Sequence, residues 1–435
     1  MAVFAVVALI FSKKANFAQF EGNHCAFLFI LTYNSEILCK FVAPISPSNY
    51  YSLNMKKLSF HFLLAAMTVL FSVSCREQTT AIHKGERHIV GMDIRKDSFL
   101  LSADSVSWNG NFFATSDYIG FADKYYCSIL KFDKKTGQYL GRVLGKGKSS
   151  LEVPEFMYAY PLANDDSRII LVGSSLDVSI YNDAENVMEY RGLLDFGWDK
   201  GSKDDYASPY VYNVMEMTEF GIDIYAGEGN TIILPLSFVN RNLSEINGER
   251  YRKGAIWGKY SMKEKKFMGL MGKYPDRYME HPSPNFEFFR SSPYGDGYLS
   301  CHATDSLIYV YDHDMNAVKF TFGYEFEDAD RSYTGDKYES EAEYMLDDMK
   351  RVSLNASLLC TDKYIIRSCF HKILDDREAF TSFQLYDSTT MDLVAEQKVQ
   401  GIIQFLKADG DKIYGVGVKP NTNDAYYLYT FEINK

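Results

Sequence analysis

Short polar turns divide the chain after about residue 85 into segments in which apolar and polar residues alternate. The same order returns six times: a turn, an apolar strand, a second strand, a second turn and a third strand. Each unit spans about 50 to 70 residues and holds about four strands, which is typical of a propeller blade. The six second strands are expected at 109–118, 166–173, 230–238, 297–303, 363–370 and 411–418. This pattern predicts an all-β fold, a six-bladed β-propeller of four-stranded antiparallel blades.

The two ends of the repeat region are expected to close this ring. In the last unit, residues 412–418 and 426–433 supply strands before the sequence ends. Residues 86–94 also read as a strand, and they have no partner in the first unit. We therefore expect residues 86–94 to pair with residues 426–433 in one blade, because a closed ring leaves no long unpaired edge.

One segment departs from the strand pattern and predicts a helix. Apolar residues recur at helical spacing from 336 to 352, and Asp336 and Glu339 form a capping-box pair at the start of this segment. We expect a helix of about four turns, inserted in the crossing from the fourth blade to the fifth.

Residues 55–74 have the organisation of a secretory signal peptide. Lys56 and Lys57 form a basic start, and an apolar region follows from 58 to 73. The apolar region is too short, and has the wrong flanking residues, for a stable membrane span. The sequence therefore predicts export from the cytoplasm.

The signal segment ends at Cys75, and it resembles the lipobox of bacterial lipoproteins. The resemblance implies cleavage before Cys75 and lipid on its sulfur, and the alternative is an ordinary signal peptide with an incidental cysteine. We interpret residues 1–54 as upstream sequence translated from a misplaced start, with a membrane-embedded leader as the alternative. Residues 75–84 are polar and read as a tether, and residues 85–435 are assigned to the propeller.

Charge and cysteine content narrow the range of partners. The chain has 57 acidic and 46 basic residues, and its formal net charge of −11 argues against a nucleic acid partner and against a basic membrane-binding patch. Beyond residue 75 there are four cysteines: Cys127, Cys301, Cys360 and Cys369. We expect them to be small buried residues in strands, although Cys360 and Cys369 flank one strand pair and could form a disulfide.

A family resemblance rests on the segment LGRVLGKGKSSLEVPEF at 140–156. Gly145, Gly147, Glu155 and Phe156 match the G-x-G…E-F element that follows the outer strand in NHL-like and related propellers. Together with the lipobox, this makes the chain resemble the six-bladed, TolB-like propeller lipoproteins of Bacteroidota, of the BF3164-like group. The resemblance implies a six-bladed fold and a lipid-anchored position in the bacterial cell envelope, at the outer membrane, rather than a particular reaction.

Linear motifs for catalysis, metal binding or cofactor binding are missing from the sequence, which has no HExxH, no CxxC, no G-x-S-x-G and no phosphate loop. We therefore expect no cofactor and no metal. The sharpest local pattern is 328–339, where oxygen ligands occupy the positions of an EF-hand loop, but Tyr333 stands where the turn needs Gly. We favour an acidic loop that caps the following helix, and calcium binding by Asp328, Asp330 and Glu339 is the alternative.

Propeller ligands usually lie over the central channel, and we expect them on the face formed by the blade crossings and by the loops that join second and third strands. The candidate binding residues on that face are Glu155, Trp198, Tyr210, Tyr212, Arg290, His302 and His371. Aromatic rings beside an arginine suit a sugar or a peptide, although each aromatic residue could instead belong to the core.

Two functions are compatible with this sequence. The first is a non-catalytic module that is held in the envelope and binds a glycan, a peptide or a protein partner. The second is a hydrolase or lyase that acts on a glycan at the channel mouth. The missing motifs favour the first function, whereas two carboxylates about 5–10 Å apart at the mouth would favour a glycosidase.

Overall fold

The computed structural model separates the chain after Thr79, and all of the described residues belong to the second unit. The structure describes residues 82–90, 93–174, 177–194, 212–213, 222–238, 251–252, 254–281, 286–332, 347–375, 377–419 and 425–434. The predicted upstream extension, the signal peptide and Cys75 lie outside these residues. None of the helices in the described ranges is long and apolar enough to span a membrane.

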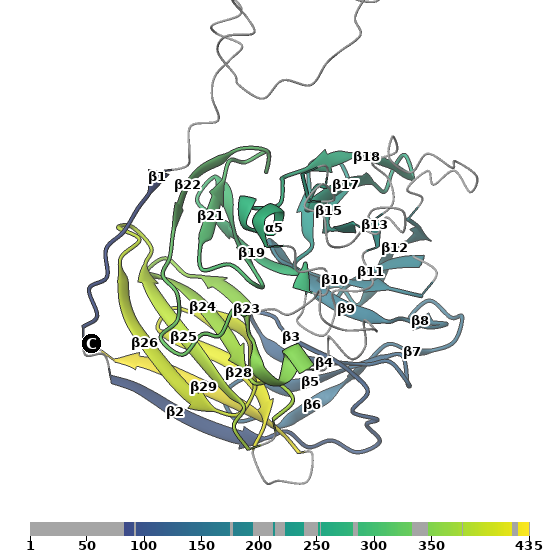
Figure 1. Ribbon diagram of the computed structural model, residues 1–435. Helices are drawn as coiled ribbons and strands as arrows, with labels where there is room; N and C mark the ends of the chain where they lie inside the picture. The colour runs from purple at the N-terminus through teal and green to yellow at the C-terminus, as the bar shows by residue number, and fades with distance from the viewer. Residues whose placement is uncertain are drawn as a thin grey trace, which may run out of the picture. The chain divides into compact units, whose positions relative to one another are not determined.

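Six four-stranded antiparallel blades confirm the predicted six-bladed β-propeller (Figure 1). From the innermost strand outward, the first three blades are β3 (Gly110–Ala114), β4 (Tyr118–Asp123), β5 (Ser128–Asp133) and β6 (Tyr139–Val143); β9 (Tyr158–Leu162), β10 (Asp165–Val172), β11 (Asp177–Asn182) and β12 (Val187–Leu193); and β14 (Tyr225–Gly227), β15 (Thr231–Pro235), β17 (Trp257–Ser261) and β18 (Lys266–Met271).

The other three blades follow the same order. They are β19 (Phe289–Tyr294), β20 (Gly297–His302), β21 (Ile308–Tyr311) and β22 (Val318–Phe322); β23 (Ser353–Cys360), β24 (Tyr364–His371), β25 (Phe380–Asp387) and β26 (Leu393–Gln400); and β27 (Ile403–Asp409), β28 (Lys412–Val418), β29 (Tyr426–Asn434) and β2 (Asp93–Leu100). Two short pairs complete the strands: β7 (Gly145–Lys146) with β8 (Glu152–Val153), and β13 (Tyr212–Asn213) with β16 (Ser237–Phe238).

Pairing of the N-terminal and C-terminal strands closes the ring, as the sequence predicts, but the closing strand differs from the predicted one. Strand β2 runs antiparallel to β29, with Ile94 opposite Ile433 and Leu100 opposite Tyr427. Only the last residues of the predicted strand 86–94 take part in this pairing. The alternation in β2 is weak because this outer strand has no fully buried residue: Ile94 and Phe99 are partly buried and pack against two different core clusters, on opposite faces of the blade.

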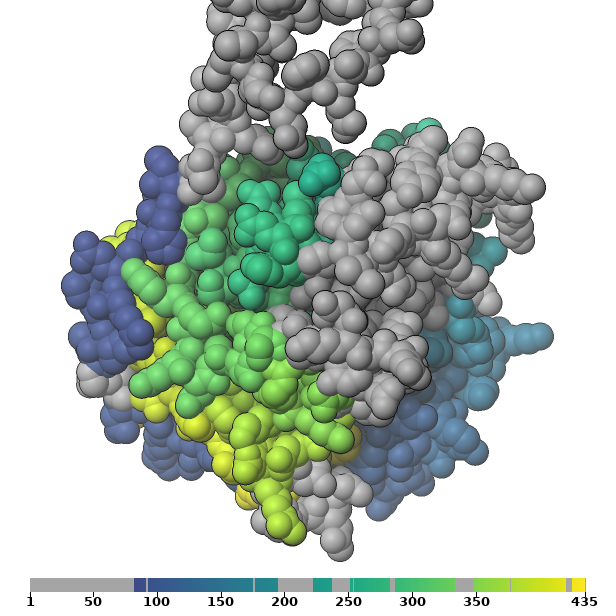
Figure 2. All heavy atoms as spheres, in the orientation of Figure 1, coloured from purple at the N-terminus to yellow at the C-terminus, as the bar shows by residue number. Residues whose placement is uncertain are grey.

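Residues 82–90 instead form an extended strap along the outer edges of blades 4 and 5. Strand β1 (Ile82–His83) pairs in parallel with β22, and the backbone then exchanges hydrogen bonds with β26 from Glu86 to Val90 (2.8–2.9 Å). The strap therefore covers the outer edges of blades 4 and 5, whereas β2 itself forms the outer edge of blade 6. In Figure 2 these purple residues lie on the outer side of the green and yellow part of the molecule.

Side chains also tie the innermost strands to one another around the channel. Asn111 of blade 1 exchanges two hydrogen bonds with the backbone of β9 (2.8 and 3.3 Å), and Asn164 of blade 2 exchanges two with the backbone of β14 (2.8 Å each). The hydroxyl of Ser357 in blade 5 donates to the carbonyl of Phe405 in blade 6 (2.9 Å). These contacts hold the inner strands in a fixed ring.

Aromatic side chains fill the space between neighbouring blades. Trp257 of blade 3 is fully buried and meets the rings of Phe289 and Tyr311 in blade 4 edge to face, at centroid distances of 5.2 and 5.0 Å. Phe383 of blade 5 packs similarly on Phe405 of blade 6 (5.1 Å). Such pairs bury large apolar areas in a specific geometry, so the high aromatic content of the sequence is explained by packing between blades.

Two smaller predictions have mixed outcomes. Residues 347–351 are helical, as predicted, and the rest of the predicted helix up to 346 lies outside the described residues. A second short helix, α5 (Asp276–Glu280), is not predicted by the sequence pattern, since five residues are too few to show a period. All four cysteines from Cys127 to Cys369 are free thiols. Cys360 and Cys369 lie near opposite ends of the β23–β24 pair, which rules out a disulfide between them.

Candidate functional site

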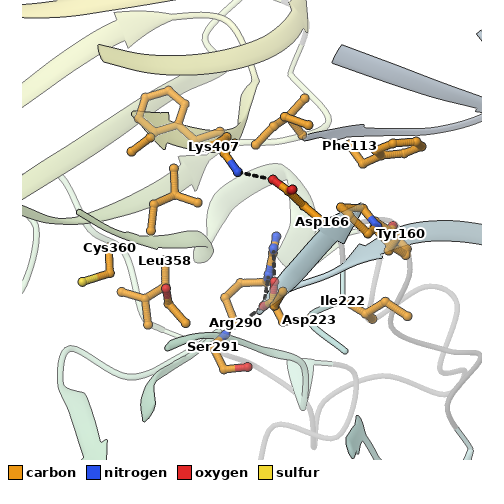
Figure 3. A pocket seen from close by; sticks show the side chains of 18 of the residues that line it. Phe113, Tyr160, Asp166, Ile222, Asp223, Arg290, Ser291, Leu358, Cys360 and Lys407 are labelled. Carbon is orange, nitrogen blue, oxygen red and sulfur yellow. Dashed lines mark hydrogen bonds and ion pairs between the residues drawn. The ribbon is translucent and has the colours of Figure 1, made fainter. Parts of the chain in front are cut away.

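A cavity of about 280 Å³ lies in the centre of the ring, and all six blades contribute to its wall (Figure 3). The lining residues are Phe112–Ala114 in blade 1; Tyr160–Ala163 and Asp166 in blade 2; Ile222 and Asp223 next to β14 in blade 3; Arg290–Pro293 in blade 4; Leu358–Cys360 in blade 5; and Gln404–Ala408 in blade 6. A central pocket to which every blade contributes is the first place to expect a ligand in this fold.

The more exposed part of the lining lies next to the turns between first and second strands, where the side chains of Lys407 and Asp166 are 27% and 28% exposed. Cys360 is the last residue of its inner strand, Ala408 lies near the end of another, and Asp166 lies at the start of a second strand. Ile222 and Asp223, in contrast, precede the inner strand β14, so the cavity runs along the channel. The more exposed part of its lining lies at the end of the channel opposite to the face on which the sequence placed the ligand.

A buried ion pair between Asp223 and Arg290 forms one part of the wall. The Arg290 guanidinium donates from Nη2 and Nε to the two carboxylate oxygens of Asp223 (2.8 and 2.9 Å), and its Nη1 donates to the carbonyl of Ala356 (3.2 Å). Burial opposes the positive charge, but the adjacent Asp223 carboxylate raises the pKa of Arg290 above its ordinary value. The pair thus joins blades 3, 4 and 5 through charges that cancel.

A second ion pair, between Asp166 and Lys407, lies in the more exposed part of the wall (Figure 3). Lys407 Nζ donates to Asp166 Oδ2 (2.6 Å), and the hydroxyl of Ser116 donates to the same oxygen (2.8 Å). Partial burial alone would raise the pKa of Asp166, but the hydrogen bonds from Lys407 and Ser116 hold it below its usual range. The ion pair therefore bridges blades 2 and 6 across the blade 1 turn, with Asp166 ionised at neutral pH.

The chemistry of this wall is polar and electrically balanced. Each inner strand is the terminal strand of its sheet, so one edge of its backbone N–H and C=O groups is left without a strand partner and faces the channel. Tyr160 adds an aromatic side chain, and burial raises the pKa of its phenol so that it stays protonated. Both carboxylates in the described lining, Asp166 and Asp223, are held by cations. The arrangement is suited to recognition by hydrogen bonds rather than to acid–base catalysis.

Of the seven candidate binding residues predicted from the sequence, Arg290 lines this cavity. Glu155 is exposed on the predicted face, where it accepts a hydrogen bond from the hydroxyl of Ser174. Tyr212 begins the short strand β13. Trp198 and Tyr210 lie outside the described residues. Among the candidates that the structure describes, Arg290 alone lines the cavity, and Glu155 lies apart from it.

His302 and His371 are buried inside their blades and do not reach the surface of the predicted face. His302 is enclosed by the rings of Tyr278, Phe289 and Tyr309 at centroid distances of 5.3–5.8 Å. His371 stacks on Phe380 (4.3 Å). Their positions at the ends of second strands are as expected, but the elements above them cover the rings, so the two histidines are core residues.

Burial of these two histidines is expected to make the protein less stable in acid. Desolvation lowers the pKa of His302 to about 3 and that of His371 to about 4, whereas unfolded histidine titrates near 6.5. The contribution of the two neutral histidines to the free energy of unfolding is therefore fully present above pH 6.5. It is lost as the pH falls towards 4, at about 1.4 kcal/mol per pH unit for each histidine. Urea unfolding at pH 7, 5.5 and 4 measures this loss.

His302→Phe is the matched variant for this measurement. In the described structure neither ring nitrogen of His302 has a hydrogen-bond partner, so a phenyl ring is expected to be tolerated at pH 7. Its free energy of unfolding should then depend less steeply on pH than that of the wild type. An unchanged slope would show that His302 is not protonated on unfolding in this range.

The predicted EF-hand-like loop has structural partners for its described carboxylates. Asp328 pairs with Lys398 (3.1 Å), and Asp330 pairs with Arg351 (3.3 Å) and accepts a hydrogen bond from the backbone of Ser332 (2.9 Å). No cluster of three or more metal-binding side chains occurs among the described residues. Glu339 lies outside them. The described half of the loop is thus held by cationic side chains.

Of the four charged residues of the cavity, Arg290 alone is a candidate from the sequence. Asp166 falls at the start of an expected strand, and no pattern in the sequence marks Asp223 or Lys407. The available signal was weak: a charged residue near the inner strand of a blade is unusual, but inner strands were the least clearly marked element of each unit. Only the fold brings Asp223 to Arg290, which lies 67 residues away in the sequence.

Comparison with known proteins supports the fold but not a family. No protein-family model and no curated protein matches this chain. A DUF4221 family protein from Bacteroides vulgatus has a similar crystal structure, with a TM-score of 0.59 and 10% identity over 80% of this chain and 100% of that chain. The two proteins share a fold. A candidate exported protein from Bacteroides fragilis gives a TM-score of 0.47 and 12% identity over 81% of this chain and 100% of that chain.

Proposed function

We propose that this chain is a lipoprotein of the bacterial cell envelope, of the six-bladed TolB-like or NHL-like kind in the BF3164-like group, and that its propeller binds a ligand in the central cavity. The ligand is a glycan or a peptide segment, free or presented by a protein partner. The signal segment, the lipobox at Cys75 and the motif at 140–156 support the envelope position. The fold supports a binding role, since propellers are scaffolds for sites of many kinds.

The observation that carries the binding proposal is the balanced polar wall of the cavity. Two internally neutralised ion pairs and the open edges of inner strands offer donors and acceptors without a net charge. The hydroxyl groups of a sugar and the backbone of a peptide match such a surface. A volume of about 280 Å³ lies just below the usual range for ligand pockets, roughly 300–1,000 Å³, so only a single sugar ring or a short peptide end would enter.

Hydrolysis of a glycan is less well supported by this geometry. Acid-catalysed cleavage needs one carboxyl group that remains protonated. The hydrogen bonds from Lys407 and Ser116 keep Asp166 ionised, and Asp223 is occupied by Arg290. Release of a smaller sugar during a binding assay would overturn this preference.

Lys407→Met is expected to lower the affinity for a ligand in the cavity by about tenfold to a hundredfold, because the ligand would lose a charge-assisted hydrogen bond worth about 1.5–3 kcal/mol. Glycans and peptides that raise the melting temperature of the wild type would first be selected, and their affinities then measured by calorimetry. Lys319→Met removes a comparable lysine from a surface pair with Asp296 and should leave affinity unchanged. Equal affinities of the Lys407→Met and Lys319→Met proteins would show that the ligand does not bind in the central cavity.

Cys75→Ala is expected to release the protein from the membrane fraction, because the lipid is attached to the Cys75 sulfur in this proposal. The intact mass of the purified wild type should correspond to a chain that begins at Cys75 and carries lipid. A mature protein that retains residues 1–54 would contradict both the start-site and the lipidation interpretations.

A further inference from the structure

The strap of residues 82–90 is held on the outer edges of blades 4 and 5 mainly by its backbone. Lys84 N donates to Thr321 O (2.8 Å), and Leu393 N donates to Glu86 O (2.8 Å). Every residue of the strap is exposed except Gly85, which is partly buried. A segment with so few buried contacts detaches at a lower free-energy cost than the unfolding of a blade. We therefore expect the strap to leave these edges while the blades stay folded.

The shape of the edge requires a glycine at one position of the strap. Gly85 has a φ of 83°, in the left-handed region that favours glycine. A Cβ atom on this residue would lie 2.1 Å from the carbonyl oxygen of Met391, in the turn before the outer strand of blade 5. The hydroxyl of Tyr324 donates to the carbonyl of Gly85 (3.0 Å). A larger residue at this position would therefore be strained and would collide with the backbone of blade 5.

The edge also presents aromatic and acidic groups to the basic residues of the strap. The Lys84 ammonium lies over the ring of Phe320, 3.9 Å from its centroid. The Arg87 guanidinium lies 4.0 Å from the carboxylate of Glu396, and the carboxylate of Asp392 accepts a backbone N–H of the strap (2.6 Å). These contacts match an extended segment in which a basic residue precedes the glycine and a second basic residue follows two positions after it.

The strap leaves part of this site unfilled. A cavity of about 270 Å³ lies beside Lys84, between Tyr294 and Tyr311 of blade 4 and Thr389 and Met391 of blade 5. A competing segment whose side chain enters this cavity would make contacts that the strap lacks. Such contacts are needed for displacement, because a strap in the same chain competes at a high effective concentration.

We propose that the outer edge of blades 4 and 5 binds an extended basic segment of a partner protein by strand addition, and that the strap occupies this edge as an autoinhibitory segment. Strand addition supplies main-chain hydrogen bonds, and the contacts of side chains supply specificity. Charge complementarity with Asp392 and Glu396 defines the partner segment, which carries basic residues at the positions of Lys84 and Arg87. The site is separate from the central cavity and does not depend on the lipid anchor.

A fluorescent peptide that copies residues 82–90 tests this proposal on the full chain. Gly85→Val should release the strap, because valine is strained at this φ and its Cβ atom would collide with Met391. We expect the peptide to bind the Gly85→Val protein at least about tenfold more tightly than the wild type, in which the strap competes. Gly410→Val is the matched control, because Gly410 also has a positive φ (60°) but its Cβ atom would meet nothing within 4 Å. This control should bind the peptide no better than the wild type.

Hydrogen exchange of the Leu393 amide, which donates to Glu86 O in the docked strap, shows whether the strap has left. A released strap without peptide binding overturns the proposed site. A Leu393 amide that stays protected in the Gly85→Val protein overturns the glycine requirement on which the proposal rests.

A second peptide tests the chemistry of the partner segment. With Lys84→Met and Arg87→Met together, the peptide should bind the Gly85→Val protein several-fold more weakly, and equal binding would overturn the selection of a basic segment. Dimers of the wild-type chain that the original peptide dissociates would make a second copy the occupant, and this would overturn the assignment to a different protein.

Discussion

A chain that begins at residue 101 is expected to lose the cooperative unfolding of the whole propeller, whereas a chain that begins at residue 93 is expected to keep it. The difference between them is strand β2, which pairs with β29 along its full length. Without β2, the strand β29 becomes a long open edge, and the contacts of Ile94 and Phe99 with their core clusters are lost. Because closure links the first described blade to the last, the loss should spread around the ring.

Urea unfolding followed by fluorescence, with hydrogen exchange resolved by blade, measures this effect. The chain that begins at residue 93 is the matched control, because it lacks the strap but keeps β2. It should show slightly faster exchange in blades 4 and 5 only. A chain from residue 101 that unfolds in one transition, with faster exchange confined to blade 6, would contradict a ring held closed by its ends.

Asp223→Ala is expected to destabilise the protein by about 3–5 kcal/mol, because it leaves the Arg290 guanidinium buried without its counter-ion. The side chains of Asp223 and Arg290 are only 14% and 9% exposed, so water can replace little of the lost interaction. The free energy of unfolding in urea is the measurement. Asp296→Ala, which breaks the exposed pair with Lys319, should leave the free energy of unfolding almost unchanged.

The double variant Asp223→Ala/Arg290→Met distinguishes a charge effect from a loss of packing. Removing both charges leaves no uncompensated ion, so the double variant should lose less stability than the sum of the two single variants. Additive losses would indicate that the pair contributes through packing alone. Ligand binding by the double variant would then show whether the cavity needs this pair.

The number of blades could be predicted from the sequence because each blade repeats the same hairpin chemistry. Asp or Asn followed by polar residues marks the turn between third and fourth strands, as at Asp133 and Asp387, whose carboxylates accept backbone hydrogen bonds within the turn. The first unit was read less well. Its expected second strand, 109–118, contains β3 and the turn at Ser116, and the second strand is β4.

The site could not be predicted in the same way, because its residues share no local pattern. Asp166, Asp223, Arg290 and Lys407 come from four different blades, and their pairing depends on the positions of inner strands around the channel. The histidines were misjudged for a related reason. A loop position in sequence does not reveal that Tyr278 and Phe289 will enclose His302.

Ring closure by two distant strands also sets an order of events during synthesis of the chain. The strand β2 is made on the order of 300 residues before its partner β29. Until β29 has been made, β2 has no partner and blade 6 cannot be completed. The growing chain therefore keeps open strand edges for most of its synthesis, and such edges favour aggregation.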